Sequence, residues 1–363
     1  MGFTTPADLQ QQLHQALSHL GSLPECVLLD YPDYLNIGDH LIWLGTIFYL
    51  TDVSATHIKY IASINSFSAA EMDQHLGDAP ILLQGGGNLG DNWQRHQKFR
   101  EHIINKYRDR PIFILPQSIY FSQPAALQQA AQIFNSHPNL TIFVRDNYSH
   151  QIAQQAFHQC RIIKAPDMAL QMVGMPGLTA KTPQQKSLLY HCREDSELNP
   201  AFSPQQINLP NLTIQDWISY QWIYREKLGD RPEWYWRLPG IIRLIREGWQ
   251  RGFSHPQEWI SRQQWQHWHP YNSKLNSLTH ATWHQKSWSL MHSGIYQFQQ
   301  YHLVITNRLH GHITCLLLGI PHIFLPNSYH KNEYFYQTWT AEIPFCCFVN
   351  DATQIKVAIE KIF

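Results

Sequence analysis

The 363-residue sequence lacks an excess of charge of either sign, because 27 lysines and arginines balance 27 aspartates and glutamates. This balance argues against a nucleic-acid binder that works through an overall positive field. Long hydrophobic runs are also missing: the longest, Leu41–Leu50, is shorter than the ~20 residues of a transmembrane helix. The first residues do not have the pattern of a signal peptide. We therefore expect a cytoplasmic protein that binds no nucleic acid.

Cysteine is scarce as well. The six cysteines, at positions 26, 160, 192, 315, 346 and 347, show neither CxxC spacing nor the spacing of a small secreted disulfide framework. Reduced thiols are the expectation. Two residue types are abundant instead, with 22 histidines and 13 tryptophans. We expect most of the histidines to lie on the surface.

Short apolar runs that alternate with helix-like stretches indicate strands buried on both faces of a parallel sheet. In the first half these runs are Cys26–Leu29, Pro80–Gln84, Pro111–Leu115 and Leu140–Val144. In the second half they are Ser187–His191, Leu303–Thr306 and Ile320–Leu325. At roughly 150 residues per domain the length favours two domains. We predict an α/β protein with an N-terminal Rossmann-like domain over 1–178 and a C-terminal one over 179–363, joined near the Gly-, Pro- and Gln-rich stretch 173–185.

A Trp-rich segment interrupts the second half. Residues 217–288 hold 10 of the 13 tryptophans, with 10 lysines and arginines against 5 acidic residues, and we predict a helical insertion over about 217–290. Within it, Leu238–Phe253 is basic, aromatic and amphipathic, a pattern that suits an anionic membrane surface. The tryptophans would otherwise stack on sugar rings or simply form a core or a dimer interface.

The segment Arg308–Gly311 is the most suggestive candidate site, because it lies between a predicted strand and a predicted helix. Backbone N–H groups at a helix N-terminus attract anions, and Arg308 adds a fork that grips carboxylate or phosphate. His310 exchanges protons near neutral pH without a large pKa shift. Lys331 brings a second cation to the same edge. The alternative is that Arg308 pairs with a structural carboxylate and His310 caps the helix.

Two further arginines follow predicted strands. Arg145 ends a strand of the first half and would point across the cleft between the domains, and Arg193 ends the first strand of the second half. A lone arginine at a strand end is usually solvated or structural. Several arginines and a lysine in one cleft would instead suit a small ligand with both phosphate and carboxylate groups.

Two loops contain glycine and polar residues. Gly85–Asp91 resembles a strand-to-helix turn, but it lacks the Lys-Ser/Thr of a P-loop and does not match GxGxxG. Asn36–Asp39 has the same placement, with Asp39 as the predicted helix N-cap. Each loop has either a purely structural role or hydrogen-bonds a polyol such as a sugar.

Together these segments resemble the polysaccharide pyruvyl transferase family, over nearly the whole chain apart from the Trp-rich segment. The matching pieces are Asn36–Asp39, Gly85–Asp91, Val144–Asp146 with Ser149, Arg308–Gly311, Gly319–Pro321 and Ser328–Lys331. The resemblance implies a GT-B-like fold in which two domains face a cleft. It also implies an enzyme of exopolysaccharide and cell-envelope biosynthesis that moves the enolpyruvyl group of phosphoenolpyruvate onto two sugar hydroxyls as a ketal.

The resemblance also implies site residues, with the phosphoenolpyruvate on the C-terminal domain and the acceptor on the N-terminal one. The residues that fall on positions implicated in catalysis are His310, Arg308, Lys331 and Arg145. The expected donor-binding residues are Gly311, Ser328, Asn327 and Arg193. The expected acceptor-binding residues are Asn36, Asp39, Gly86, Gly87, Asn88 and Asp91. His310 would protonate the methylene carbon of the donor or deprotonate the attacking hydroxyl.

The expected partners are phosphoenolpyruvate and a sugar or lipid-linked oligosaccharide, the latter with peripheral membrane contact through 217–288 at the inner face of the membrane. No metal or other cofactor is required by this scheme, in which phosphoenolpyruvate is a co-substrate. Two alternatives remain open. One is a GT-B glycosyltransferase that uses a nucleotide sugar, and the other is a non-catalytic sugar-binding relative.

Overall fold

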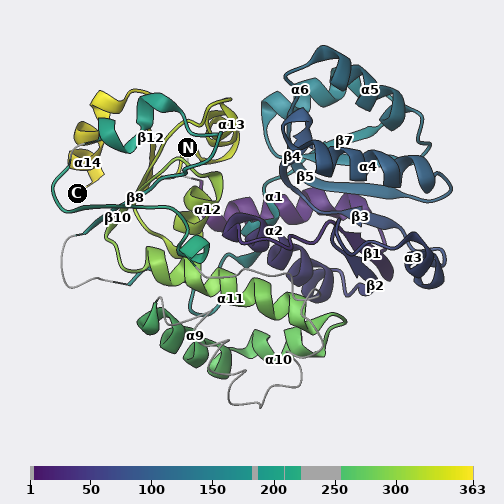
Figure 1. Cartoon of the computed structure of the whole chain (residues 1–363), viewed down its shortest axis with the longest axis horizontal. Coiled ribbons are helices and arrows are strands. Elements are labelled where there is room, and N and C mark those ends of the chain that lie inside the picture. The colour runs from purple at the N-terminus through teal and green to yellow at the C-terminus, as the bar shows by residue number, and fades with distance from the viewer. Residues whose placement is uncertain (1–3, 182–186, 208, 222–254, 363) are drawn as a thin grey trace, which may run out of the picture.

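The computed structural model describes residues 4–181, 187–207, 209–221 and 255–362. These residues form two parallel sheets with helices around them (Figure 1). The first sheet has the order β2-β1-β3-β5-β6-β7, and β4 pairs with β5 beside this path. Its strands are β1 (Glu25–Leu29), β2 (His57–Ala62), β3 (Ile81–Leu83), β4 (Gly86–Gly90), β5 (Ile112–Tyr120), β6 (Leu140–Val144) and β7 (Arg161–Lys164). Every residue of β3 and β6 is buried, which explains their unbroken apolar sequences.

Helices connect these strands as in a Rossmann-like fold. They are α1 (Pro6–Leu17), α2 (Ile37–Phe48), α3 (Ala69–Leu76), α4 (Gln94–Lys106), α5 (Pro124–Asn135) and α6 (Asn147–Ala156). The helix α2 is buried along almost its whole length, and it packs against α11 (Ala281–Phe298) and α12 (Leu309–Leu318) of the second half. In Figure 1, α1 and α2 lie in the middle of the molecule, between the two sheets.

The second sheet has the order β12-β11-β10-β8-β9, again with parallel pairs throughout its described strands. Its strands are β8 (Leu188–His191), β9 (Leu212–Gln215), β10 (Leu303–Thr306), β11 (His322–Phe324) and β12 (Cys346–Phe348). The remaining helices of this half are α13 (Lys331–Phe335) and α14 (Ile355–Ile362). The predicted α/β class is therefore confirmed, and the predicted strands at 187–191, 303–306 and 320–325 match β8, β10 and β11.

The described part of the Trp-rich segment is helical, as predicted. It contains α9 (Pro256–Trp268), α10 (Pro270–Ser277) and the first part of α11, which lie below both sheets in Figure 1. Trp217, Trp265 and Trp288 are buried, so these tryptophans fill a core. The membrane-surface candidate Leu238–Phe253 lies outside the described residues. Within the described chain, every helix is too short or too polar to cross a bilayer.

Two local predictions are wrong. Residues Gly86–Gly90 do not form a turn but the strand β4, paired with β5. Gly90 has φ +136°, and a Cβ there would lie 1.7 Å from the Tyr120 carbonyl oxygen, so only glycine fits this pairing. Asp39 is not the N-cap of α2. That position belongs to Asn36, whose side chain accepts a hydrogen bond from the Gly38 N–H.

Most of the 22 histidines keep some exposure, as expected, but eight are buried, namely His40, His137, His191, His269, His284, His292, His312 and His322. An imidazole is tolerated in a core when it is neutral and hydrogen-bonded. His40, for example, contacts the Ser287 hydroxyl and the Tyr34 carbonyl, and burial lowers the pKa of His40 to about 3.

The stretch that joins the two sheets packs against the core where it is described. Met175 and Leu178 are buried, and the Ala180 N–H donates to the carbonyl of Leu318. Residues 182–186 lie outside the described residues. A domain boundary at 178 therefore stays a prediction.

Candidate active site

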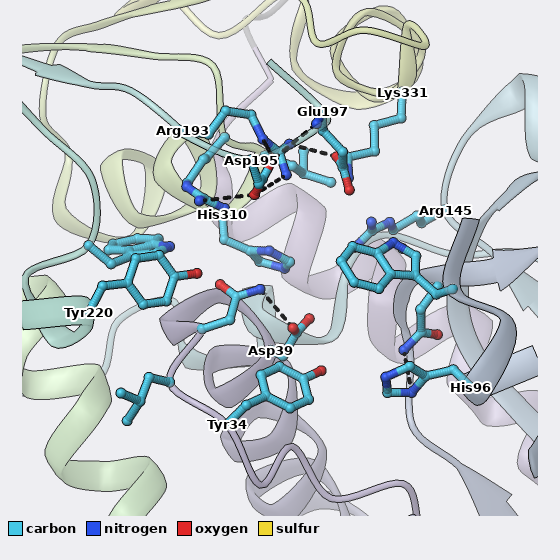
Figure 2. Close-up of a pocket in the computed structure, with 18 residues that line it drawn as sticks. Tyr34, Asp39, His96, Arg145, Arg193, Asp195, Glu197, Tyr220, His310 and Lys331 are labelled. Carbon is cyan, nitrogen blue, oxygen red and sulfur yellow. Dashed lines mark hydrogen bonds and ion pairs between the residues drawn. The ribbon is translucent and has the colours of Figure 1, made fainter. Parts of the chain in front are cut away.

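A cavity of about 330 Å³ lies between the two halves of the chain, and both contribute to its lining (Figure 2). The first half contributes Tyr34, Leu35, Asn36, Asp39, Gly87, Asn88, Trp93, His96 and Arg145. The second half contributes Arg193, Asp195, Glu197, Trp217, Tyr220, Arg308, Leu309, His310 and Lys331. Figure 2 shows Arg193, Asp195, Glu197 and Lys331 at one end, Tyr34, Asp39 and His96 at the other, and His310 between them.

His310 is backed by a carboxylate that the sequence analysis did not single out. The Nε2 atom of His310 lies 3.5 Å from Oδ2 of Asp167, and the same oxygen accepts a 2.5 Å hydrogen bond from Nη1 of Arg145. Asp167 is fully buried. Although burial opposes its charge, His310 and Arg145 hold the pKa of Asp167 below its usual range. Asp167 is thus a buried anion that contacts both His310 and Arg145.

Arg145 is fixed on three sides. Its Nε donates to the Ser118 hydroxyl at 2.9 Å, Nη1 donates to Asp167, and its carbonyl accepts from the Trp339 indole of the second half at 2.8 Å. The remaining nitrogen, Nη2, lies against Gly87, where an added Cβ would be only 2.9 Å away. The absence of a side chain at Gly87 therefore leaves room for the guanidinium.

Lys331 approaches the same point from the other half. An added Cβ at Gly87 would lie 3.5 Å from Nζ of Lys331. That ammonium donates to Glu197 and, at 2.8 Å, to the Tyr329 hydroxyl, which leaves one of its three N–H groups. Burial lowers the pKa of Lys331 to about 8, against the opposing effect of Glu197. Two cations from opposite halves of the chain thus converge on Gly87.

Arg193 and Arg308 are both paired with carboxylates. Arg193 donates to Asp195 at 2.7 Å and to Glu197 at 2.6 Å. Arg308 grips Asp216 through two bonds of 2.5 and 2.6 Å, and its Nη2 lies 3.3 Å from Asp195. Despite burial, Asp216 raises the pKa of Arg308. The alternative is thus right that Arg308 pairs with carboxylates, although Arg308 also lines the cavity. It is wrong that His310 caps the helix, because the N-cap of α12 is Arg308 and no described side chain caps it.

The formal charges of these groups balance. Four cations, Arg145, Arg193, Arg308 and Lys331, are paired with four carboxylates, Asp167, Asp195, Glu197 and Asp216. The pairs hold the cations in place, and a protonated His310 adds one positive charge. Anion recognition here depends on which N–H groups face the cavity rather than on a net positive field.

The opposite wall belongs to the first half. Asn36 caps α2 and donates through Nδ2 to Asp39 at 2.7 Å, and both residues line the cavity. Gly38 packs against His310, since an added Cβ would lie 2.5 Å from Nδ1 of the imidazole. Asn88 also lines the cavity, and its Oδ1 accepts from Arg100 at 2.8 Å.

A second histidine with a carboxylate partner, His96, lies on the wall formed by the first half. Nδ1 of His96 lies 3.0 Å from Oδ1 of Asp30 and 3.2 Å from Nδ2 of Asn88. His96 lines the cavity, whereas Asp30 is buried behind it. This pair was missed from the sequence because His96 lies on α4, away from any strand end.

The other missed residues follow strands. Asp30 comes directly after β1, Asp216 directly after β9, and Asp167 three residues after β7. The carboxyl ends of parallel strands meet at the ligand-binding edge of a sheet. Applied to the predicted strands, this rule would have marked Asp30, whereas β7 and β9, which precede Asp167 and Asp216, were not predicted.

Five of the predicted site residues do not line the cavity: Gly86, Asp91, Gly311, Asn327 and Ser328. Asp91 accepts from the N–H groups of Ser122 and Gln123 at the start of α5. Gly311 packs against Thr306 and His191, and Asn327 accepts from the Asn332 N–H. Ser328 is exposed. Direct ligand contact by these five residues stays a prediction.

Comparison with known proteins agrees with this arrangement. The family model described as polysaccharide pyruvyl transferase matches residues 36–329. A Bacillus subtilis (strain 168) protein named "Putative pyruvyl transferase EpsO" is 30% identical over 348 residues, with 95% of each chain covered. "Pyruvyl transferase 1" of Schizosaccharomyces pombe is 24% identical over 335 residues, which cover 88% of this chain and 71% of that protein.

A crystal structure of a functionally uncharacterized protein from Klebsiella pneumoniae aligns with a TM-score of 0.55 and 18% identity. The alignment covers 96% of this chain and 100% of that one, and at this identity it supports the fold alone. The family match spans the cavity walls from Asn36 to the loop before α13. This chain belongs to the polysaccharide pyruvyl transferase family.

Proposed function

We propose that this protein transfers the pyruvyl group of phosphoenolpyruvate to two hydroxyls of a sugar, forming a pyruvate ketal and releasing phosphate. The observation that carries the proposal is the convergence of Arg145 and Lys331 on Gly87, beside the His310–Asp167 pair. Cations and an acid–base group within one enclosed cavity are what a small, reactive anion requires.

The donor would bind where these cations face the cavity. Phosphoenolpyruvate carries about three negative charges near neutral pH, from its phosphate and carboxylate. Nη2 of Arg145, the remaining N–H of Lys331 and the first turn of α12 at Leu309 are directed to one region. Because other N–H groups of these cations are already bound to carboxylates and hydroxyls, the cations are preorganised to receive the donor.

His310 would then act as the general acid. It donates a proton to the methylene carbon of the donor, and positive charge develops at the adjacent carbon that bears the phosphate. Asp167 stabilises the imidazolium before this transfer and fixes the ring orientation. A sugar hydroxyl attacks the cationic carbon, the C–O bond to phosphate breaks, and a second hydroxyl of the same sugar closes the ketal.

The acceptor would lie against the first half of the chain. Asp39, Asn36 and Asn88 offer polar side chains, and Tyr34 and Trp93 offer rings, which is the usual composition of a sugar site. His96, held by Asp30, is placed to take the proton of the attacking hydroxyl. The acceptor is thus a sugar of a polysaccharide or of its lipid-linked precursor, used on the cytoplasmic side of the membrane.

Incubation with phosphoenolpyruvate and a panel of nitrophenyl and lipid-linked glycosides tests this proposal. We expect phosphate release to match, mole for mole, the gain of a pyruvyl ketal on one acceptor. His310→Gln should abolish turnover and leave phosphoenolpyruvate binding measurable by calorimetry. Binding of a nucleotide sugar but not of phosphoenolpyruvate would replace the proposal with the GT-B glycosyltransferase alternative. Binding of sugars without turnover would favour the non-catalytic alternative.

A further inference from the structure

Away from the cavity, the second half of the chain contains a buried cluster of two histidines and a cysteine. The cluster consists of His312, His322 and Cys346, which offer one ligand atom each within 4.8 Å of one another. Nδ1 of His312 lies 2.7 Å from Nε2 of His322 and 3.7 Å from Sγ of Cys346. None of the three lines the catalytic cavity.

The hydrogen bonds of His322 leave a lone pair directed at the cluster. Its Nδ1 lies 2.9 Å from the carbonyl of Ile320, which can only accept, so Nδ1 carries the proton and Nε2 is unprotonated. A ligating histidine commonly donates its second ring nitrogen to a backbone carbonyl in this way.

His312 is satisfied at one nitrogen only. With Nε2 of His322 as acceptor, Nδ1 of His312 is the donor of their hydrogen bond. Nε2 of His312 is then a buried polar atom without a hydrogen-bond partner among the described residues. Its ring stacks on Phe324 with centroids 4.2 Å apart and planes 4° apart, so the imidazole is held in a fixed orientation.

The distances fit a small cation after a slight adjustment. Tetrahedral zinc with Zn–N near 2.0–2.1 Å and Zn–S near 2.3 Å requires about 3.3 Å between nitrogens and about 3.6 Å from nitrogen to sulfur. The cluster has 2.7 and 3.7 Å. The nitrogens need to separate by only about half an ångström to admit the ion.

Three protein ligands are present at the cluster. Two imidazoles and one thiol are donors that zinc accepts, and a water molecule would complete a tetrahedral set, as at other zinc sites with three protein ligands.

The cluster lies close to solvent on one side, and its ligands come from three elements of the second sheet and its helix. Cys346 lies on β12, the edge strand of the second sheet, and retains 8% exposure. The ligands come from α12, β11 and β12, so an ion would join the helix that begins just after Arg308 to the edge of its sheet.

We propose that His312, His322 and Cys346 bind Zn²⁺, with a water molecule completing the coordination. When the ion enters, the Cys346 thiol loses a proton to solvent. The His312 proton moves from Nδ1 to Nε2, which frees Nδ1 to ligate. The site is structural and separate from the catalytic cavity, so it does not depend on the proposed function.

Metal uptake by the full chain tests the proposal. After dialysis against a chelator, we expect one equivalent of Zn²⁺ to bind per chain and to raise the melting temperature. Co²⁺ should give the sulfur-to-cobalt charge-transfer absorption of a thiolate site. Cys346→Ser should remove this absorption and weaken Zn²⁺ binding by more than about 100-fold, since loss of an outer-shell partner alone costs roughly 10–100-fold.

Cys347→Ser is the matched control, because Cys347 is the adjacent thiol and does not belong to the cluster. It should retain both the absorption and the Zn²⁺ affinity. Circular dichroism of the metal-free Cys346→Ser chain shows whether that variant folds, and His322→Gln provides a second test if it does not. Failure of the wild-type chain to bind stoichiometric Zn²⁺, or an unchanged Co²⁺ spectrum in Cys346→Ser, would overturn the proposal.

Discussion

Asp167 connects two residues of the cavity, because a single oxygen contacts both His310 and Arg145. The carboxylate lies beside the imidazole and fixes the guanidinium of Arg145. The positions of His310 and Arg145 are therefore coupled through one buried anion.

Asp167→Asn should lower kcat by about 10²-fold or more, the usual contribution of a well-placed acid–base group. The amide keeps the shape of the carboxylate but no longer favours the imidazolium. Continuous measurement of phosphate release gives kcat. Asp73→Asn is the matched control, since Asp73 contacts Tyr107 and Lys106 and lies outside the cavity. Equal losses in both variants would mean that Asp167 acts through stability alone.

Lys331 makes donor binding dependent on pH. Its pKa is lowered to about 8, so the ammonium is charged below this value and neutral above it. Affinity for phosphoenolpyruvate should therefore fall as pH rises through about 8. Lys331→Arg should shift the fall to higher pH, because a guanidinium stays charged. Calorimetric titration across this range checks the shift, and Lys361→Arg on α14 should leave the profile unchanged. A profile that Lys331→Arg does not move would exclude this lysine as its source.

A substitution at Gly87 tests whether the donor binds where Arg145 and Lys331 converge. Gly87→Ala places a methyl group 2.9 Å from Nη2 of Arg145, so the guanidinium must move away. We expect KM for phosphoenolpyruvate to rise about 10-fold, equivalent to roughly 1.4 kcal/mol of lost donor binding. Steady-state kinetics measure KM, and a thermal melt shows whether folding is retained. An unchanged KM would place the donor elsewhere in the cavity.

At the scale of the elements, strand ends explain most of the site. Arg145, Arg193 and Asp216 each come within two residues of the end of a parallel strand, so the two sheets present them toward the same space. The helices α2 and α12 meet between the sheets, where Gly38 packs against His310. The close packing of these two helices brings the two walls within reach of one small ligand.

The element α11 anchors the Trp-rich region to this core. Trp288 on α11 is fully buried, between Trp265 and Phe48. Trp288→Ala should lower the free energy of unfolding by about 3–5 kcal/mol through lost burial and the resulting cavity. Trp268→Ala is the matched control, because Trp268 is 53% exposed and should cost less than about 1 kcal/mol. Urea unfolding compares the two variants, and similar costs would argue against a core role for Trp288.

At the scale of the whole molecule, the arginine and lysine ion pairs of the cavity form within each half, and their cations face one space between the halves. The chain is neutral overall and the cavity ion pairs also cancel, yet the unpaired N–H groups face a single region. The second half supplies His310 and Lys331, and the first supplies Arg145, Asp167 and His96. Neither half contains the proposed reaction centre by itself.

We also predict a contact between the whole molecule and the membrane surface, through residues 217–288. The excess of basic over acidic residues in that segment, 10 against 5, should make the chain float with anionic vesicles but not with neutral ones. Exchange of Arg243 and Arg246 for glutamate should weaken flotation, whereas Lys356→Glu on α14 should not. Equal recovery with anionic and neutral vesicles would rule out the electrostatic contact.

The sequence by itself determined the α/β class, the positions of most strands and the candidate residues of the C-terminal loop. Apolar runs and glycine breaks are local signals, and the strands that they mark are buried on both faces. The same signals identified Arg145, Arg193, Arg308, His310 and Lys331, because each lies beside a predicted strand or helix end.

Only the tertiary structure decided which partners these residues have. Asp167, Asp216 and the His96–Asp30 pair act across long sequence separations, and no local pattern links them to Arg145, Arg308 or Asn88. The strand β4 and the buried histidines likewise depend on neighbours that are distant in sequence. The local pattern of the chain specifies where strands and helices form, whereas the pairing of buried charges is specified only when the sheets, α2 and α12 pack together.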